Sequence, residues 1–75
     1  MKRFVYVTSH EYSVVNVFDS VDKQVEAVHR FIENNGLTEE DISVTILTED
    51  CIKYSFKGMA DSPFKVLYLE RWEVE

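Results

Sequence analysis

The chain is short, acidic and poor in cysteine. It has 75 residues, a formal net charge of −6 at pH 7 and one cysteine, Cys51. This length predicts a single domain over residues 1–75 with a small core. The lone cysteine excludes an internal disulfide, and the negative charge disfavours direct binding to the phosphates of nucleic acids.

The negative charge is unevenly spread along the chain. Most of the excess of Asp and Glu over Lys and Arg lies in residues 38–75. Such a surface complements a basic protein partner, although acidity that serves solubility alone has the same signature. Residues 1–7 hold two basic side chains but no long apolar run, so neither a signal peptide nor a membrane span is predicted. Together with the single cysteine, this favours a cytoplasmic location.

The N-terminal segment predicts a β-hairpin. Residues 3–8 are rich in β-branched and aromatic side chains, which favour a strand. Residues 9–12 are mostly polar and predict a turn, and residues 13–18 predict a second strand. One unbroken strand over this whole segment would far exceed the usual length of about 5–6 residues.

The next segment predicts an amphipathic helix. Either Asp19 or Ser20 can cap its N-terminus. Gly36 suits the left-handed position that ends a helix, and Leu37 follows where a hydrophobic contact is expected. Charged residues fill the side opposite an apolar stripe. The stripe consists of Val21, Val25, Val28 and Ile32.

The C-terminal half predicts three more strands. Residues 38–41 resemble a capping box and predict one short helical turn. The strands that follow alternate apolar and polar residues or are rich in apolar residues. The strands are expected at residues 42–48, 52–57 and about 64–74, with a turn at 49–50 and a loop at 58–63. The element order ββαβββ predicts an α+β fold, with one main helix packed on one face of a mostly antiparallel sheet.

The N-terminal half has a familiar pattern. It contains the segments YVTSHEY at residues 6–12 and VNVFDS at residues 15–20. This start resembles that of many small phage and prophage proteins of unknown function, in which a hairpin ending in Val-Phe precedes an amphipathic helix. His10 stands where glycine is common in that group. The resemblance covers less than half of the chain and carries over no catalytic residue. It implies an accessory protein in a bacterial or phage-infected host cytoplasm.

Three of the expected strands carry apolar residues on both faces, whereas a single helix covers only one face of a sheet. We therefore expect an exposed apolar patch, which monomers seldom tolerate, and hence an interface, most simply that of a symmetric homodimer. The alternative is that the sheet curls, or that the 58–63 loop folds over the patch. The interface candidates are Val5, Val7, Leu67, Leu69, Arg71 and Trp72.

Trp72 allows two interpretations. Trp, Tyr and Arg are the usual anchors of protein interfaces, and Arg71 and Tyr68 lie close to Trp72 in the sequence. Tryptophan is also highly buried on average, which favours a place for Trp72 in the core beneath the helix.

Three groups of residues are of types used in catalysis or metal binding. His29 and Glu33, four apart on the expected helix, supply two ligands where a structural zinc takes four. Ser9 is adjacent to His10 in a turn, but no oxyanion donor can be named. Cys51 follows two acidic residues, which raise the pKa of a thiol and lower its reactivity. The sequence therefore predicts no catalytic residue, no metal and no cofactor.

These observations favour a small binding module that docks a protein partner and modulates or inhibits a host protein. The alternative is a homodimeric structural or assembly domain without inhibitory activity. A small enzyme is less favoured because no set of residues forms a credible site. Acidic stretches at residues 38–41 and 49–50, at the two ends of the expected strand 42–48, can also imitate the phosphates of DNA, but they carry less charge than such mimics usually do.

Overall fold

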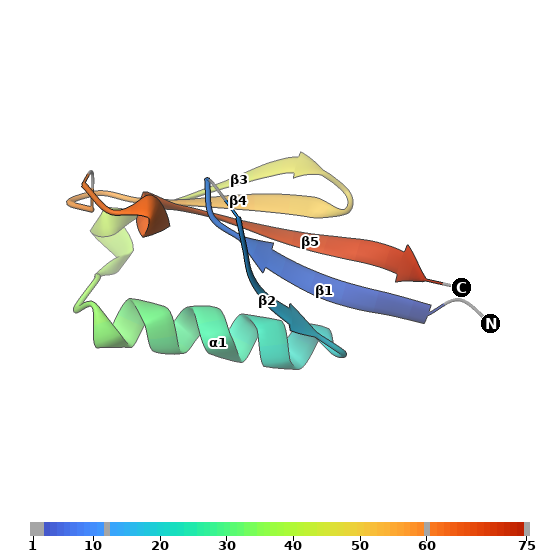
Figure 1. Ribbon diagram of the computed structural model, residues 1–75. Coiled ribbons are helices and arrows are strands. Elements are labelled where there is room, and N and C mark those ends of the chain that lie inside the picture. The colour runs from blue at the N-terminus through green and yellow to red at the C-terminus, as the bar shows by residue number, and fades with distance from the viewer. Residues whose placement is uncertain (1–2, 12, 60, 75) are drawn as a thin grey trace.

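A computed structural model describes residues 3–11, 13–59 and 61–74. The described residues form five strands, one α-helix and two short 3₁₀ turns (Figure 1). In chain order these are β1 (Arg3–Ser9), β2 (Val14–Phe18), α1 (Val21–Asn34), η1 (Glu39–Asp41), β3 (Ile42–Thr48), β4 (Cys51–Phe56), η2 (Pro63–Lys65) and β5 (Val66–Val74). Tyr12 of the expected first turn and Ala60 of the expected loop lie outside the described residues.

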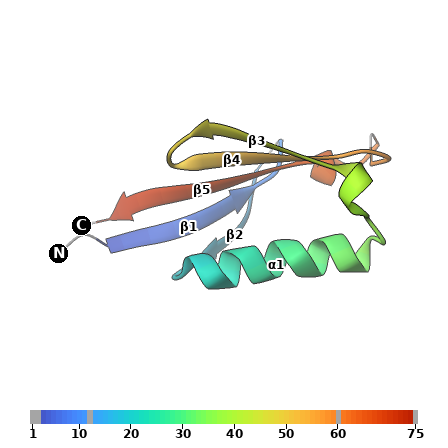
Figure 2. The ribbon, with the colours of Figure 1, turned by 180° about the vertical axis from the view of Figure 1, so that it is seen from behind.

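The five strands form one antiparallel sheet in the order β2-β1-β5-β4-β3. The predicted α+β fold, with the order ββαβββ and one main helix, is therefore confirmed. The helix lies nearest β1 and β2, and in both views the β3–β4 hairpin stands away from it (Figures 1 and 2). β2 and β3 are consequently the two edge strands of the described sheet.

The hairpin of β1 and β2 contains an irregularity that re-aims one side chain. Thr8 lies opposite Asn16, but Ser9 lies opposite Val14, so Val15 is an extra residue in β2. A β-bulge of this kind turns a side chain relative to simple alternation. Val15 accordingly packs against the core beneath the helix.

Both ends of α1 follow from the sequence. Ser20, rather than Asp19, is the N-cap, and its Oγ accepts a bond from the Lys23 N–H at 3.3 Å. At the C-terminus Gly36 has φ of 63°, a left-handed conformation that glycine adopts at little cost. The N–H groups of Gly36 and Leu37 donate to the carbonyls of Glu33 and Ile32 at 3.1 Å each. These two bonds form a Schellman motif, which ends the helix where the sequence predicts.

One short turn, η1, connects the helix to β3, and the other, η2, lies between β4 and β5. The predicted turn at 38–41 is confirmed: the Asp41 carboxylate accepts bonds from the N–H of Thr38 at 2.9 Å and from its hydroxyl at 3.0 Å. The prediction that the last strand begins at about residue 64 is wrong. Pro63 fixes the φ angle of the first residue of η2, and Ser62 caps this turn by accepting from the Phe64 N–H at 3.1 Å. The strand therefore begins at Val66.

The core lies toward the C-terminal half of α1. The buried residues there are Val28, Phe56, Leu67 and Leu69. Phe31 of the helix joins them, with its ring centroid 5.2 Å from that of Phe56. Aromatic pairs at this separation add to the stabilisation that burial provides. The helix is therefore held to the sheet most firmly at the end where η1 and η2 lie (Figure 2).

Among the helices of the described residues, none is both long and apolar enough to cross a membrane.

Candidate functional site

The strand register defines which residues share a face of the sheet. Thr8 lies opposite Leu69, and Val7 lies opposite Glu70. Since directly opposed residues point to the same side, Leu67 and Leu69 share the face of Thr8, toward the helix. We call this the helix-side face. Val5 and Val7 point to the other face, which we call the outer face.

The expected exposed patch of four residues is therefore wrong. Leu67 and Leu69 are 3% and 7% exposed because they form the core under the helix. Val7 is 3% exposed although it points to the outer face. It lies in β1 between Val17 of β2 and Glu70 of β5, so neighbours on both sides shelter it. Of the four, Val5 is half-buried.

Trp72 lies on the outer face, opposite Val5. Its side chain is 51% exposed, so the interpretation that it belongs to the core beneath the helix is wrong. Val17, opposite Val7 on the same face, is also exposed. Exposed apolar residues therefore remain on the outer face, but they are Val14, Val17, Trp72 and Val74 rather than the predicted group.

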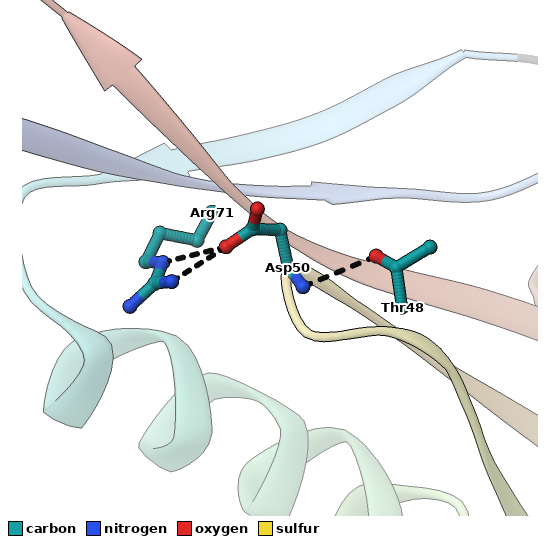
Figure 3. Close-up of polar contacts among 3 residues, drawn as sticks. All are labelled: Thr48, Asp50 and Arg71. Carbon is teal, nitrogen blue, oxygen red and sulfur yellow. Dashed lines mark hydrogen bonds and ion pairs between the residues drawn. The ribbon is translucent and has the colours of Figure 1, made fainter.

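Arg71 pairs with residues of its own chain, so its side chain is not free for a partner. Its Nε and Nη2 donate to Asp50 Oδ1 at 2.9 and 2.6 Å (Figure 3). Its main-chain N–H also donates to the Asp50 carbonyl at 2.9 Å, and its guanidinium lies 4.7 Å from the ring centroid of Phe4. The Asp50 N–H in turn donates to the hydroxyl of Thr48 at 3.1 Å (Figure 3). Arg71 thus fixes the β3–β4 turn to β5, a role that the sequence alone does not predict.

A glutamine of the helix replaces part of the expected apolar stripe. Gln24 is only 4% exposed, and its side-chain Nε2 donates to the carbonyl of Val7 at 3.2 Å and to the hydroxyl of Thr8 at 3.4 Å. Val21 and Val25 are 48% and 39% exposed. The helix is therefore turned so that Gln24 meets β1, and the N-terminal part of the predicted stripe faces solvent.

An open groove lies between this part of the helix and the sheet. It has a volume of about 280 Å³. Val21 and Val25 form its helical wall, and apolar side chains of the helix-side face form its floor. The floor consists of Tyr6, Ile52, Tyr54 and Leu69. Glu49, Asp50 and Arg71 stand at the end where the β3–β4 turn lies.

The apolar surface continues from the groove onto β3. Val44 lies opposite Tyr54, and Ile46 lies opposite Ile52, so both share the helix-side face with the floor of the groove. Ile46 is 74% exposed, more than any other exposed large apolar residue of the described chain, and Val44 is exposed as well. The groove and β3 together form the candidate interaction surface.

His10, one of the candidate catalytic residues, contacts the side chains of Ser13 and Phe64. The Oγ of Ser13 lies 3.2 Å from Nε2 of His10, and the ring of His10 meets that of Phe64 edge-on at 5.1 Å. His29 and Glu33 are both exposed. In the ranges that the structure describes, no three His, Cys, Asp or Glu residues gather closely enough to hold a metal ion.

The predicted direction of the Cys51 shift is confirmed, but its cause differs. Burial is the main factor that raises the pKa of the thiol, and the Glu70 carboxylate raises it further. Glu70 lies directly opposite Cys51 on β5. The acidic residues that precede Cys51 in the sequence are not the cause.

No known protein family, curated protein or solved structure matches this chain.

Sequence reasoning missed the groove and the free side of β3. Because Gln24 is polar, the sequence does not predict its burial, and helical spacing places Val21 and Val25 in the core instead. A signal for β3 was present in the sequence: residues 42–48 contain no charge, yet acidic residues precede and follow them. That pattern is unusual for an edge strand, which natural proteins tend to protect with charged side chains.

Proposed function

We propose that the protein is a small acidic binding module that docks part of another protein on the candidate interaction surface. The observation that carries this proposal is the open groove beside β3, with Val21, Val25 and Ile46 exposed around it. Apolar surface of this kind, rimmed by charged residues, is typical of protein interaction sites. The acidic charge of −6 favours a basic partner.

The resemblance of the N-terminal half to small phage and prophage proteins suggests the biological setting. In that setting the protein modulates or inhibits a host protein by occupying one of its surfaces. Binding without chemistry is sufficient for such an effect, and a short rigid domain can achieve it. The enzyme alternative has no specific observation in its favour.

Capture from bacterial lysate tests the proposal. Val21→Asp places a charge in the wall of the groove at the first residue of α1, where an acidic side chain suits the helix dipole. Val14→Asp is the matched control, because Val14 is similarly exposed but lies on β2, away from the groove. We expect Val21→Asp to abolish capture of a specific partner and Val14→Asp to retain it. Equal capture by both variants would exclude the groove as the binding site.

A homodimer is the second candidate, and the exposed apolar residues of the outer face, with Trp72 the largest of them, favour it. Sedimentation at low micromolar concentration tests this candidate with the wild type and Trp72→Ala. A wild-type dimer that dissociates in the variant supports it. A wild-type monomer at every concentration excludes it and leaves the binding module unaffected.

A further inference from the structure

We propose that the occupant of the candidate interaction surface is an extended, basic peptide segment of the partner, which adds a sixth strand to the sheet alongside β3. This inference rests on the proposed function and specifies the chemistry of the partner. The direction of main-chain groups on β3, the side chains that surround them and the charges at the two ends of the strand support it.

The main chain of β3 presents polar groups to the open edge of the sheet. The Lys57 N–H donates to the Asp41 carbonyl at 2.7 Å, which makes these two residues a hydrogen-bonded pair. Bonded and non-bonded pairs alternate along an antiparallel ladder, so the main chain of Thr45 faces β4. The N–H and C=O groups of Val44 and Ile46 consequently point away from β4, toward the position of an added strand.

β3 lacks the features that usually protect an edge. Natural edge strands are short, bulged, charged or interrupted by proline. β3 extends over Ile42–Thr48 without a charge or a proline, and its one register irregularity lies near the turn, between Ile46 and Thr48. The other edge strand, β2 (Val14–Phe18), is shorter and contains the bulge at Val15. β3 is therefore the edge that is better suited to pairing with another chain.

The side chains around this edge favour an apolar, alternating peptide. Val44 and Ile46 project from the helix-side face next to Ile52 and Tyr54. An added strand would place every second side chain on the same face. Apolar residues at these positions would cover Val44 and Ile46 and extend the floor of the groove, whereas the intervening residues would face the other side of the sheet.

The charges at the ends of β3 favour basic flanking residues in the peptide. Glu39 and Glu40 precede the strand and Glu49 follows it, and all three are exposed. In the part of the chain that the structure describes, their carboxylates make no ion pair, whereas Arg71 pairs with Asp50. Because the strand between them is uncharged, a peptide with Lys or Arg at both ends and apolar residues between them is complementary in charge along its whole length.

The same charges argue against a second copy of this chain as the occupant. If two copies of β3 paired in antiparallel fashion around Thr45, Glu49 of each copy would lie opposite Asp41 of the other. A parallel pairing would set each acidic stretch beside its own copy. Like charges directly opposite one another destabilise a pair of strands, so both of these pairings of β3 with itself are unfavourable at their ends.

The probe is a pair of degenerate peptide mixtures, each about nine residues long to match the strand. Both mixtures alternate Thr with an equal mixture of Val, Ile, Leu and Phe, and they carry either two Lys or two Glu residues at each end. Binding to the full-length protein is measured by fluorescence anisotropy at low and high salt. We expect the Lys-flanked mixture to bind at least about tenfold more tightly, with a preference that weakens at high salt.

Two protein variants connect binding to β3. The double variant Glu39→Lys, Glu49→Lys alters exposed side chains only and should reverse the preference in favour of the Glu-flanked mixture.

Val44→Pro removes the outward N–H of Val44 without removing a donor to β4, because proline is tolerated where its missing N–H faces solvent. Val44→Ala, which keeps the N–H, is its control. We expect Val44→Pro to bind at least about tenfold more weakly than Val44→Ala.

Equal binding of the two mixtures, or an unchanged preference in the charge-reversed variant, would overturn the inference. The charge-reversed variant decides the question even if Val44→Pro does not fold. If the mixtures fail this test while a cellular partner is still lost in Val21→Asp, the proposed function stands and only the strand-addition inference is wrong. If that partner is also insensitive to Val21→Asp, both are wrong.

Discussion

The side-chain amide of Gln24 donates to the main-chain carbonyl of Val7, 17 residues earlier in the chain, at 3.2 Å. This bond joins a side chain of the helix directly to the main chain of β1. It fixes the rotation of the helix about its axis, and that rotation leaves Val21 and Val25 at the wall of the groove rather than in the core. The position of one buried amide thus determines which apolar side chains remain open to a partner.

Gln24→Ala should lower the free energy of unfolding by about 1–3 kcal/mol, because it leaves the buried carbonyl of Val7 and hydroxyl of Thr8 with fewer partners. The exposed Lys23, which pairs with Asp19 at the surface, provides the matched control on the same helical turn. Lys23→Ala should change the stability by less than about 1 kcal/mol. Urea denaturation followed by circular dichroism measures both changes. Equal effects would mean that the amide does not hold the helix.

The core and the candidate interaction surface should respond differently to substitution. Phe56 is buried between the helix and the sheet, and Phe56→Ala should cost about 3–5 kcal/mol. Ile46→Thr keeps a β-branched side chain at an exposed position and should change the stability by no more than about 0.5 kcal/mol. Thermal unfolding of the two variants makes the comparison. A large loss in Ile46→Thr would show that β3 is covered, contrary to the structure.

The single tryptophan reports on the outer face. Because Trp72 is 51% exposed, its fluorescence in the native protein should be red-shifted and readily quenched by acrylamide. Unfolding in urea should shift its emission maximum only slightly. A blue-shifted native emission that resists quenching, and that moves to the red on dilution, would instead indicate that an interface buries Trp72.

Asp41 gives a prediction for the dependence of stability on pH. The N–H of Thr38, and then its hydroxyl, hold the pKa of the Asp41 carboxyl below its usual value. A carboxylate with a lowered pKa in the folded state stabilises the protein above its unfolded pKa of about 3.9 and loses this effect as the pH falls through the folded pKa. Asp41→Ala should therefore be less stable than the wild type at neutral pH. The difference in unfolding free energy between the two should shrink as the pH falls below about 4. A difference that stays constant would disprove the role of the carboxylate.

Much of the fold could be predicted from the sequence because local signals define it. Ser20 and Gly36 mark the ends of the helix through caps that act over a few residues, and both form the predicted interactions. The alternation of apolar residues at 42–48 and 52–57 likewise depends only on the two-residue period of a strand. The element order followed from these signals.

The faces of the sheet could not be predicted because they depend on register. Sequence alternation shows that Val5 and Val7 point the same way, but not that Val7 lies opposite Glu70 rather than Leu69. A shift of one residue in register exchanges the two faces of a strand. The observed register places Leu67 and Leu69 on the helix-side face and Val5 and Val7 on the outer face, so the four predicted patch residues do not lie together. The rotation of the helix was missed for a related reason, since the burial of Gln24 depends on a carbonyl that is distant in the sequence.

The most direct test is residue-specific amide hydrogen exchange of the free protein in solution. An open edge on β3 requires the amides of Val44 and Ile46 to exchange quickly, while the amide of Thr45, which faces β4, exchanges slowly. Addition of the Lys-flanked peptide mixture should then slow exchange at Val44 and Ile46. If both amides are already protected in the free protein as strongly as that of Thr45, the edge is covered and the strand-addition account is contradicted.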